Sequence, residues 1–271
     1  MVQAILRASI TKVMARKRGQ ILVKLRKKFK NMVHNLYLKI ANTIKSHADE
    51  VTAHSDKVFH KKDGYKSYGL KIPTLKKIIN DYKKEIKDLD LKSRFTLAGL
   101  LYRSGYAEEG RVGNAVLALS VSELKPEYYD KLNDFLDLFN NWDEVDDYSI
   151  NITQPLLNKY PTETLNLLTD WNQSENMWKR RASVVAFVRK VGESGKHTSE
   201  VIKLCDNLIW DKEDLVQKAV GWALKDNIRG ARTDVIDYIK KLRRKRVSAT
   251  ITLYAIRDLK GAEKQEIINI K

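Results

Sequence analysis

Apolar residues recur at helical spacing along almost the whole chain. Only 4 prolines and 12 glycines occur in 271 residues, and no segment shows sustained alternation of apolar and polar positions. A period near 3.6 indicates amphipathic helices and a period of 2 indicates strands, so the pattern predicts an all-α protein. The expected helices cover residues 33–51, 74–85, 91–104, 108–121, 126–140, 144–159, 162–171, 176–191, 198–210, 213–227, 232–243 and 247–259.

A weak internal repeat runs through the second half of the chain. Residues 181–185 align with residues 218–222 at an offset of 37, and Asp146 precedes Arg181 by 35 residues. Offsets of about 35–40 with two helices per unit are typical of HEAT-type solenoids. An irregular helical bundle would share the composition but not the offset. We therefore favour a HEAT-like helical-repeat solenoid, an α-α superhelix, whose equivalent second helices line one concave face.

Positive charge is concentrated at the N-terminus. The net charge is +17, yet residues 1–48 hold 12 Lys or Arg and no acid, while the remainder holds 39 basic and 34 acidic side chains. We treat residues 1–32 as an accessory basic N-terminal extension and residues 33–271 as a single HEAT-like repeat domain. The extension could be an amphipathic helix that binds phosphate, a targeting leader, or a stretch upstream of a true start at Met32. A second basic cluster at 240–246 is typical of contact with a polyanion, most often nucleic acid, although a solvated face is the alternative.

The residue types that build common cofactor sites are scarce. Cys205 is the only cysteine, which excludes an intramolecular disulfide and multi-thiolate metal sites. The histidines include no pair at close helical spacing, and glycine-rich phosphate loops are missing. We therefore expect no metal and no cofactor. The lone cysteine indicates a reducing compartment, and no run of 18 apolar residues occurs, so we expect a cytoplasmic protein without a membrane-spanning helix.

The segment 141–147, Asn-Trp-Asp-Glu-Val-Asp-Asp, places an indole ring and a carboxylate four residues apart. On a helix, Trp142 and Asp146 therefore project from one face. Two later segments again combine aromatic and cationic residues: Trp-Lys-Arg-Arg at 178–181 and Gln-Lys-Ala-Val-Gly-Trp at 217–222. If these helices are equivalent in successive repeats, their side chains converge on the concave surface.

These three segments carry a resemblance to a known family. The motifs Trp-Asp-x-Val-Asp at 142–146, Trp-x-x-Arg-Ala at 178–182 and Gln-Lys-Ala-x-Gly-Trp at 217–222 follow one another in this order. Each is weak alone, but the ordered set is fairly specific. From about residue 34 to 260 the chain resembles the AlkD-type DNA alkylation repair glycosylases, which are built from HEAT-like repeats.

The resemblance implies a role for each matched residue. Asp146, the second Asp of its motif, corresponds to the catalytic carboxylate. Trp142 and Trp222 correspond to the aromatic walls of the cleft, and Arg181 to the arginine that lies against the DNA backbone.

One position departs from the family pattern. His60 stands at the place of a cleft tyrosine, with Tyr65 nearby, and this difference bears on the range of lesions and on turnover. We assign His60 to the DNA-binding surface. Further phosphate contacts are expected from Lys179, Arg180, Lys218 and Lys225.

The same residue types make chemical sense for release of an alkylated base. A purine alkylated at N3 or N7 is cationic, so its glycosidic bond is already weakened. A carboxylate such as Asp146 stabilises the oxocarbenium-like sugar that develops, and indole faces attract a cation. The resemblance implies further that the base need not be extruded from the duplex, so that backbone shape and charge are read.

Plainer interpretations exist for the same residues. Asp146 has acidic neighbours and would also suit a helix surface. Tryptophans at helical spacing are more often part of a core, and we assign Trp171, Trp178 and Trp210 to packing. Gly221 costs about 1 kcal/mol relative to alanine inside a helix, which indicates that something approaches it closely.

The sequence therefore predicts a DNA glycosylase, most simply a monomer, that hydrolyses the N-glycosidic bond of cationic N3- or N7-alkylpurines in duplex DNA. One alternative is a non-catalytic helical-repeat module that binds nucleic acid through the same groove, because a fold by itself does not determine function. The other is a protein-binding scaffold, which would lack salt-dependent DNA affinity.

Overall fold

A computed structural model describes residues 31–60 and 64–270, and most of these residues are helical. The basic extension assigned to residues 1–32 lies almost wholly outside the described residues. After a helix over 31–45 the elements are α2 (Glu50–His60), α3 (Ile72–Lys87), α4 (Leu91–Arg103), α5 (Ala107–Ala118), η1 (Pro126–Tyr128), α6 (Tyr129–Leu136), α7 (Trp142–Tyr148), η2 (Ser149–Thr153), α8 (Gln154–Lys159), α9 (Pro161–Asn172), α10 (Met177–Val185), α11 (Lys190–Glu193), α12 (Thr198–Leu208), α13 (Asp214–Asn227), α14 (Arg232–Arg244), α15 (Ala249–Ala255) and α16 (Gly261–Asn269).

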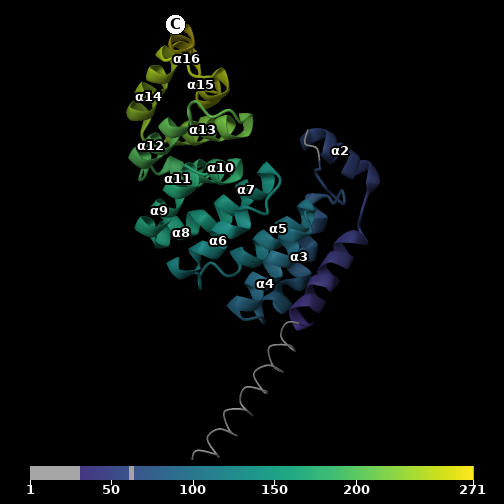
Figure 1. The fold of residues 1–271 in the computed structure, drawn as a ribbon. Coiled ribbons are helices and arrows are strands. Elements are labelled where there is room, and N and C mark those ends of the chain that lie inside the picture. The colour runs from purple at the N-terminus through teal and green to yellow at the C-terminus, as the bar shows by residue number, and fades with distance from the viewer. Residues whose placement is uncertain (1–30, 61–63, 271) are drawn as a thin grey trace, which may run out of the picture.

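The helices stack in two rows that follow one curve (Figure 1). Helices α5, α7, α10, α13 and α15 contact one another in succession and form an inner row, on the side that faces α2. Helices α9, α12 and α14 form an outer row, and α9 packs on α10, α12 on α13 and α14 on α15. This is a helical-repeat arrangement, which confirms the predicted fold class. In the described part of the chain, the only β-type pairing is an isolated bridge between Lys66 and Tyr106.

The rows are joined by a continuous apolar core, and polar caps set where the helices begin. Trp171 and Trp178 are buried in this core, as predicted. The Asn141 side chain accepts a hydrogen bond from the Glu144 N–H at 2.9 Å and starts α7. Such caps satisfy backbone donors that the first helical turn leaves unpaired. None of the described helices has the length and apolarity needed to cross a membrane.

Neither α2 nor α16 was expected from the sequence as a separate helix, and nor was the short α11. The helix predicted over 33–51 ends at residue 45, and a separate helix, α2, begins at Glu50. Because α2 buries none of its residues, it lacks the apolar stripe that would have indicated it. Helix α16 follows the last predicted helix and buries only Ile267.

Another prediction was wrong in detail. Trp210 was assigned to packing, but it is 65% exposed beyond the end of α12. Helical spacing alone cannot separate a core tryptophan from one that the end of a helix leaves outside the core.

Gly221 lies where α13 and α15 pack closely together. A Cβ atom at this position would lie 2.8 Å from the Tyr254 Cβ and 2.9 Å from the Ile251 carbonyl oxygen. The predicted close approach at Gly221 is therefore confirmed. It brings Tyr254 beside Trp222 at the open face of the inner row.

Candidate functional site

Helix α7 delivers the first two site residues to the same side of the inner row. Trp142 is the first residue of α7 and Asp146 follows one turn later. Trp142 is partly buried against the core, and Asp146 is buried. A π-helical turn, η2, continues the helix and leads to Pro155 near the start of α8. Turns of this kind are frequent near functional sites, and here the turn precedes a residue that has no N–H donor.

Asp146 and Arg181 form a two-pronged ion pair between α7 and α10. The Arg181 Nε donates to Asp146 Oδ1 and the Nη2 donates to Oδ2, both at 2.8 Å. Only 6% of the Arg181 side chain and 11% of the Asp146 side chain are exposed. Arg181 Nη1 also donates to the Leu215 carbonyl on α13. A guanidinium with five N–H donors therefore ties three inner-row helices together through three of them.

Burial dominates the electrostatics of Asp146. It raises the pKa of the Asp146 carboxyl above its usual range, and the adjacent Arg181 guanidinium opposes this shift. The carboxylate is thus held in a site of low polarity by the Arg181 guanidinium, with a smaller contribution from Arg189. In such surroundings a positive charge that develops nearby interacts with the carboxylate much more strongly than it would in water.

A cleft of about 1000 Å³ opens over this pair. It brings together six predicted site residues: Asp146, Trp142, Trp222, Arg181, Lys218 and His60. The other residues that line it are Val58, Phe59, Asp143, Asp147, Ile150, Asn151, Arg189, Asp214, Leu215 and Tyr254. The convergence expected from the repeat offset is therefore present.

One wall of the cleft is an aromatic stack. The His60 ring lies between Tyr65, 4.0 Å away between centroids, and Trp142, 5.2 Å away. Phe59 packs its ring edgewise near Trp142 at 6.1 Å. Burial lowers the pKa of His60, which favours a neutral imidazole in this stack. The position that departs from the family pattern thus still supplies a flat ring to the wall.

The opposite wall contains a residue that the sequence did not suggest. Arg189 has a φ of 55°, a backbone conformation that is uncommon for any residue except glycine. Its N–H donates to the buried Asp226 carboxylate at 2.6 Å, and its guanidinium lies 5.9 Å from the centroid of Trp222. The helix predicted over 176–191 therefore ends at Val185, and the turn after it directs Arg189 into the cleft.

Three of the predicted cations do not line this cleft. Lys179 pairs with Asp137 at 2.8 Å, and Arg180 pairs with Asp211 at 2.6 Å. Lys225 lines an adjoining hollow of about 360 Å³ that shares Arg189, Trp222 and Tyr254 with the cleft. Lys179 and Arg180 therefore connect neighbouring repeats. Lys225 is held in the same way, by Asp226 at 3.0 Å and Asp258 at 3.3 Å.

Lys218 lines the cleft but has an acidic partner. Its ammonium lies 2.6 Å from the carboxylate of Asp214, one helical turn earlier on α13. Both side chains are about half exposed or more, so the pair is weak and a phosphate group can compete for Lys218.

Glu144 lies behind the cleft and supports α7. Its carboxyl group packs against Gly110 on α5, where no side chain intervenes. The Asn140 N–H donates to it at 3.4 Å. Burial raises the pKa of Glu144 to about 8. This acid does not line the cleft, so its role is to fix the start of α7.

The described residues contain no group of three His, Cys, Asp or Glu side chains arranged to hold a metal ion. Cys205, on the outer row, is buried, and burial raises the pKa of its thiol. A buried thiol of high pKa is a poor nucleophile.

Comparison with known proteins assigns the chain to a family. Among curated proteins there is no match. A solved structure described as a predicted DNA alkylation repair enzyme from Enterococcus faecalis is similar, with a TM-score of 0.69 and 17% identity over 80% of this chain and 98% of that chain. At this identity the likeness establishes the fold. The family model for DNA alkylation repair enzymes matches residues 40–259. The chain therefore belongs to the DNA alkylation repair enzyme family.

Proposed function

We propose that this protein is a DNA glycosylase that hydrolyses the bond between deoxyribose and a cationic N3- or N7-alkylated purine in duplex DNA. The observation that carries the proposal is the buried Asp146–Arg181 pair at the base of a cleft whose walls include Trp142 and Trp222. The family assignment supports DNA as the substrate.

Asp146 is the group that acts on the reacting sugar. As the glycosidic bond breaks, its electron pair leaves with the alkylated base, which becomes neutral, and positive charge moves onto the sugar ring. The Asp146 carboxylate stabilises that charge and orients a water molecule toward the anomeric carbon. Electrostatic stabilisation of this type is often the largest single contribution to catalysis.

Arg181 and Arg189 hold the DNA backbone beside Asp146. Three of the five Arg181 donors bind Asp146 and Leu215, so the other two can reach a phosphate oxygen. Arg189 is exposed and adds a second cation at the opposite wall. Phosphate contacts of this kind fix the position of the duplex without reading its sequence.

The indole walls supply the preference for a charged lesion. Trp142 and Trp222 present aromatic faces, and each cation–π contact contributes on the order of 0.5–2 kcal/mol. A neutral purine gains much less from the same faces. The cleft is lined by residues of α2, α7, α10, α13 and α15 and so extends along the inner row. The proposal therefore includes attack on a lesion that stays in the duplex instead of entering a closed pocket.

The decisive experiment measures base release. Duplex DNA methylated with a simple alkylating agent is incubated with the protein, and free 3-methyladenine and 7-methylguanine are quantified. Asp146→Asn should lower the rate by roughly 100-fold or more, while DNA affinity stays close to that of the unmodified protein. Asp234→Asn, at an exposed position on α14, is the matched control and should keep full activity. Absence of base release by the unmodified protein would contradict the proposal.

A further inference from the structure

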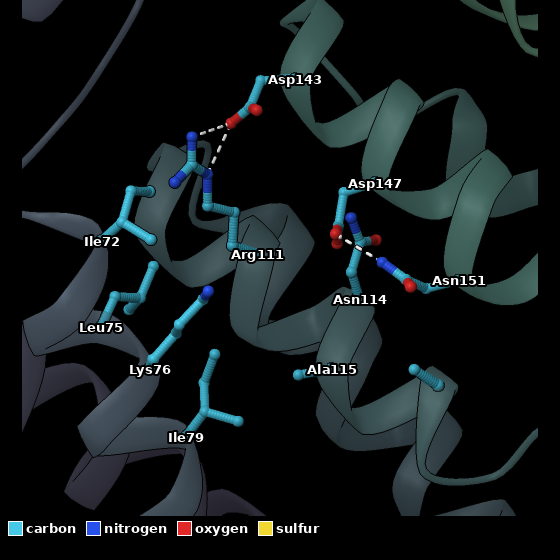
Figure 2. Close-up of a pocket in the computed structure, with 11 residues that line it drawn as sticks. Ile72, Leu75, Lys76, Ile79, Arg111, Asn114, Ala115, Asp143, Asp147 and Asn151 are labelled. Carbon is cyan, nitrogen blue, oxygen red and sulfur yellow. Dashed lines mark hydrogen bonds and ion pairs between the residues drawn. The ribbon is translucent and has the colours of Figure 1, made fainter. Parts of the chain in front are cut away.

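A second hollow, of about 390 Å³, shares lining residues with the cleft and so lies next to it. Figure 2 shows the residues that line this hollow. It is enclosed by α3, α5 and the α7–η2 segment. A volume near 400 Å³ falls within the range of about 300–1,000 Å³ that is typical of small-molecule sites. The residues that line it are Ile72, Leu75, Lys76, Ile79, Arg111, Asn114, Ala115, Ala118, Asp143, Asp147 and Asn151.

A row of polar residues separates this hollow from the cleft. Asp143, Asp147 and Asn151 follow one another at intervals of four along α7 and η2, and all three line both spaces. A ligand in the second hollow therefore lies directly across this row from the place where the reaction is proposed to occur.

The Asp147 carboxylate can accept more hydrogen bonds than the described residues donate to it. Asn151 Nδ2 donates to Asp147 Oδ1 at 2.7 Å (Figure 2), and the Asn114 amide also binds it. Asp147 forms no ion pair with any described residue, because the neighbouring cation, Arg111, is bound to Asp143 through its Nε at 2.5 Å. Burial raises the pKa of Asp147. Asp147 is half-buried, its hydrogen bonds come from two neutral amides, and Arg111 acts on it only through space. A ligand that adds donors would therefore stabilise the ionised carboxylate.

Apolar side chains line much of the rest of the hollow. Ile72, Leu75 and Ile79 form a wall on α3, while Ala115 and Ala118 leave space on α5. Lys76 points into the hollow in Figure 2, and its side chain is exposed. Its ammonium can donate to a carbonyl oxygen on a ligand that lies over Ala115.

We propose that this hollow binds a free purine base with adjacent ring N–H and amino donors, the arrangement found in guanine and in 7-alkylguanine. The two donors pair side by side with the two oxygens of Asp147, as a carboxylate pairs with any two parallel N–H groups. The neighbouring carbonyl oxygen accepts from Asn151 or Lys76, and the ring lies against the apolar wall. The inference rests on the proposed function in one respect: 7-alkylguanine is one of the products that base release would leave beside this hollow.

Isothermal titration of the complete protein with 7-methylguanine, in the absence of DNA, tests the inference. We expect saturable binding at one site. 3-Methyladenine carries a ring acceptor where 7-methylguanine carries a ring N–H, so one charge-assisted hydrogen bond is lost and binding should be at least about tenfold weaker. Equal binding of the two bases, or no binding of 7-methylguanine, would overturn the proposal.

Two variants locate the site. Ala115→Leu fills the hollow without changing the cleft and should weaken 7-methylguanine binding by about tenfold or more, because the added side chain occupies the position of the ring. Ala262→Leu, at an exposed position on α16, is the matched control and should bind normally. Asp147→Asn should remove the preference for 7-methylguanine over 3-methyladenine. Unchanged binding in both Ala115→Leu and Asp147→Asn would place the base elsewhere.

The base-release assay separates this inference from the proposed function. If the protein binds 7-methylguanine but releases no base from methylated DNA, the hollow is a purine site in a protein that is not a glycosylase. If it releases base but does not bind the free product, the proposed function stands and the inference fails.

Discussion

Arg181 binds Asp146 through two parallel hydrogen bonds of 2.8 Å, although Asp146 precedes it by 35 residues in the chain. The pair joins equivalent inner-row helices of adjacent repeats, α7 and α10. The same contact therefore stabilises the repeat stack and fixes the charge at the base of the cleft. The contribution of the pair to stability and its contribution to the reaction can therefore be measured in separate experiments.

Removal of Arg181 should destabilise the protein. Arg181→Ala leaves the Asp146 carboxylate buried without its cation, and breaking one partner of a buried pair costs on the order of 3 kcal/mol of unfolding free energy. Urea denaturation at pH 7 measures this cost. Lys218→Ala breaks a solvent-exposed pair with Asp214 and should change stability by less than about 1 kcal/mol. A similar loss in both variants would show that the burial of Asp146 has no energetic consequence.

Glu144 should make stability depend on pH. Its pKa is raised from 4.5 to about 8 in the folded protein, so the folded state holds a proton that the unfolded chain releases above pH 4.5. The free energy of unfolding contributed by this group therefore falls as pH rises from about 4.5 to 8. Glu144→Gln keeps the shape without the titration and should flatten the profile over that window. Thermal unfolding between pH 5 and 8.5 makes the comparison, and an identical slope in both proteins would argue against the shift.

Trp222 should affect the preference for charged lesions more than it affects folding. Trp222→Ala removes an aromatic face of the cleft, and we expect kcat/KM for release of 7-methylguanine to fall by about tenfold, as loss of a cation–π contact predicts. Trp222→Phe should retain part of the activity. Trp210→Ala removes an exposed indole that does not line the cleft, and should leave the rate unchanged. A rate equal to wild type in Trp222→Ala would exclude Trp222 from the reaction site.

Arg189 should contribute to the salt dependence of DNA binding. If its guanidinium contacts one phosphate, Arg189→Ala lowers the slope of log K against log salt by about 1. Fluorescence anisotropy with an undamaged duplex at several salt concentrations measures the slope. Lys92→Ala, at an exposed position on α4, is the control and should leave the slope as it is. Equal slopes in all three proteins would mean that Arg189 does not face the backbone.

Much of the fold follows from local patterns in the chain. Helical spacing of apolar residues predicted α3 to α9 and α12 to α15 within a few residues, because those helices bury one face in a common core. The start of α10 was also predicted, but this helix ends at Val185, six residues before the predicted end at 191. Helix α2 was not predicted because it buries none of its residues and so shows no apolar stripe. Trp210 was wrongly assigned to the core because helical spacing does not indicate where a core ends.

The sequence by itself determined which residues share a helical face and which helices are equivalent in the repeat. That was enough to place Asp146, Arg181 and Trp222 on one concave side. Only the tertiary structure decided which cations reach it. Lys179 and Arg180 are held by acids of neighbouring repeats. Arg189, by contrast, adopts a positive φ and its N–H is held by Asp226, and its guanidinium lies over Trp222. Which acid pairs with a given cation in the next repeat depends on how the repeats stack. The energy that fixes this stacking is distributed over the whole core, so no local sequence pattern reveals it.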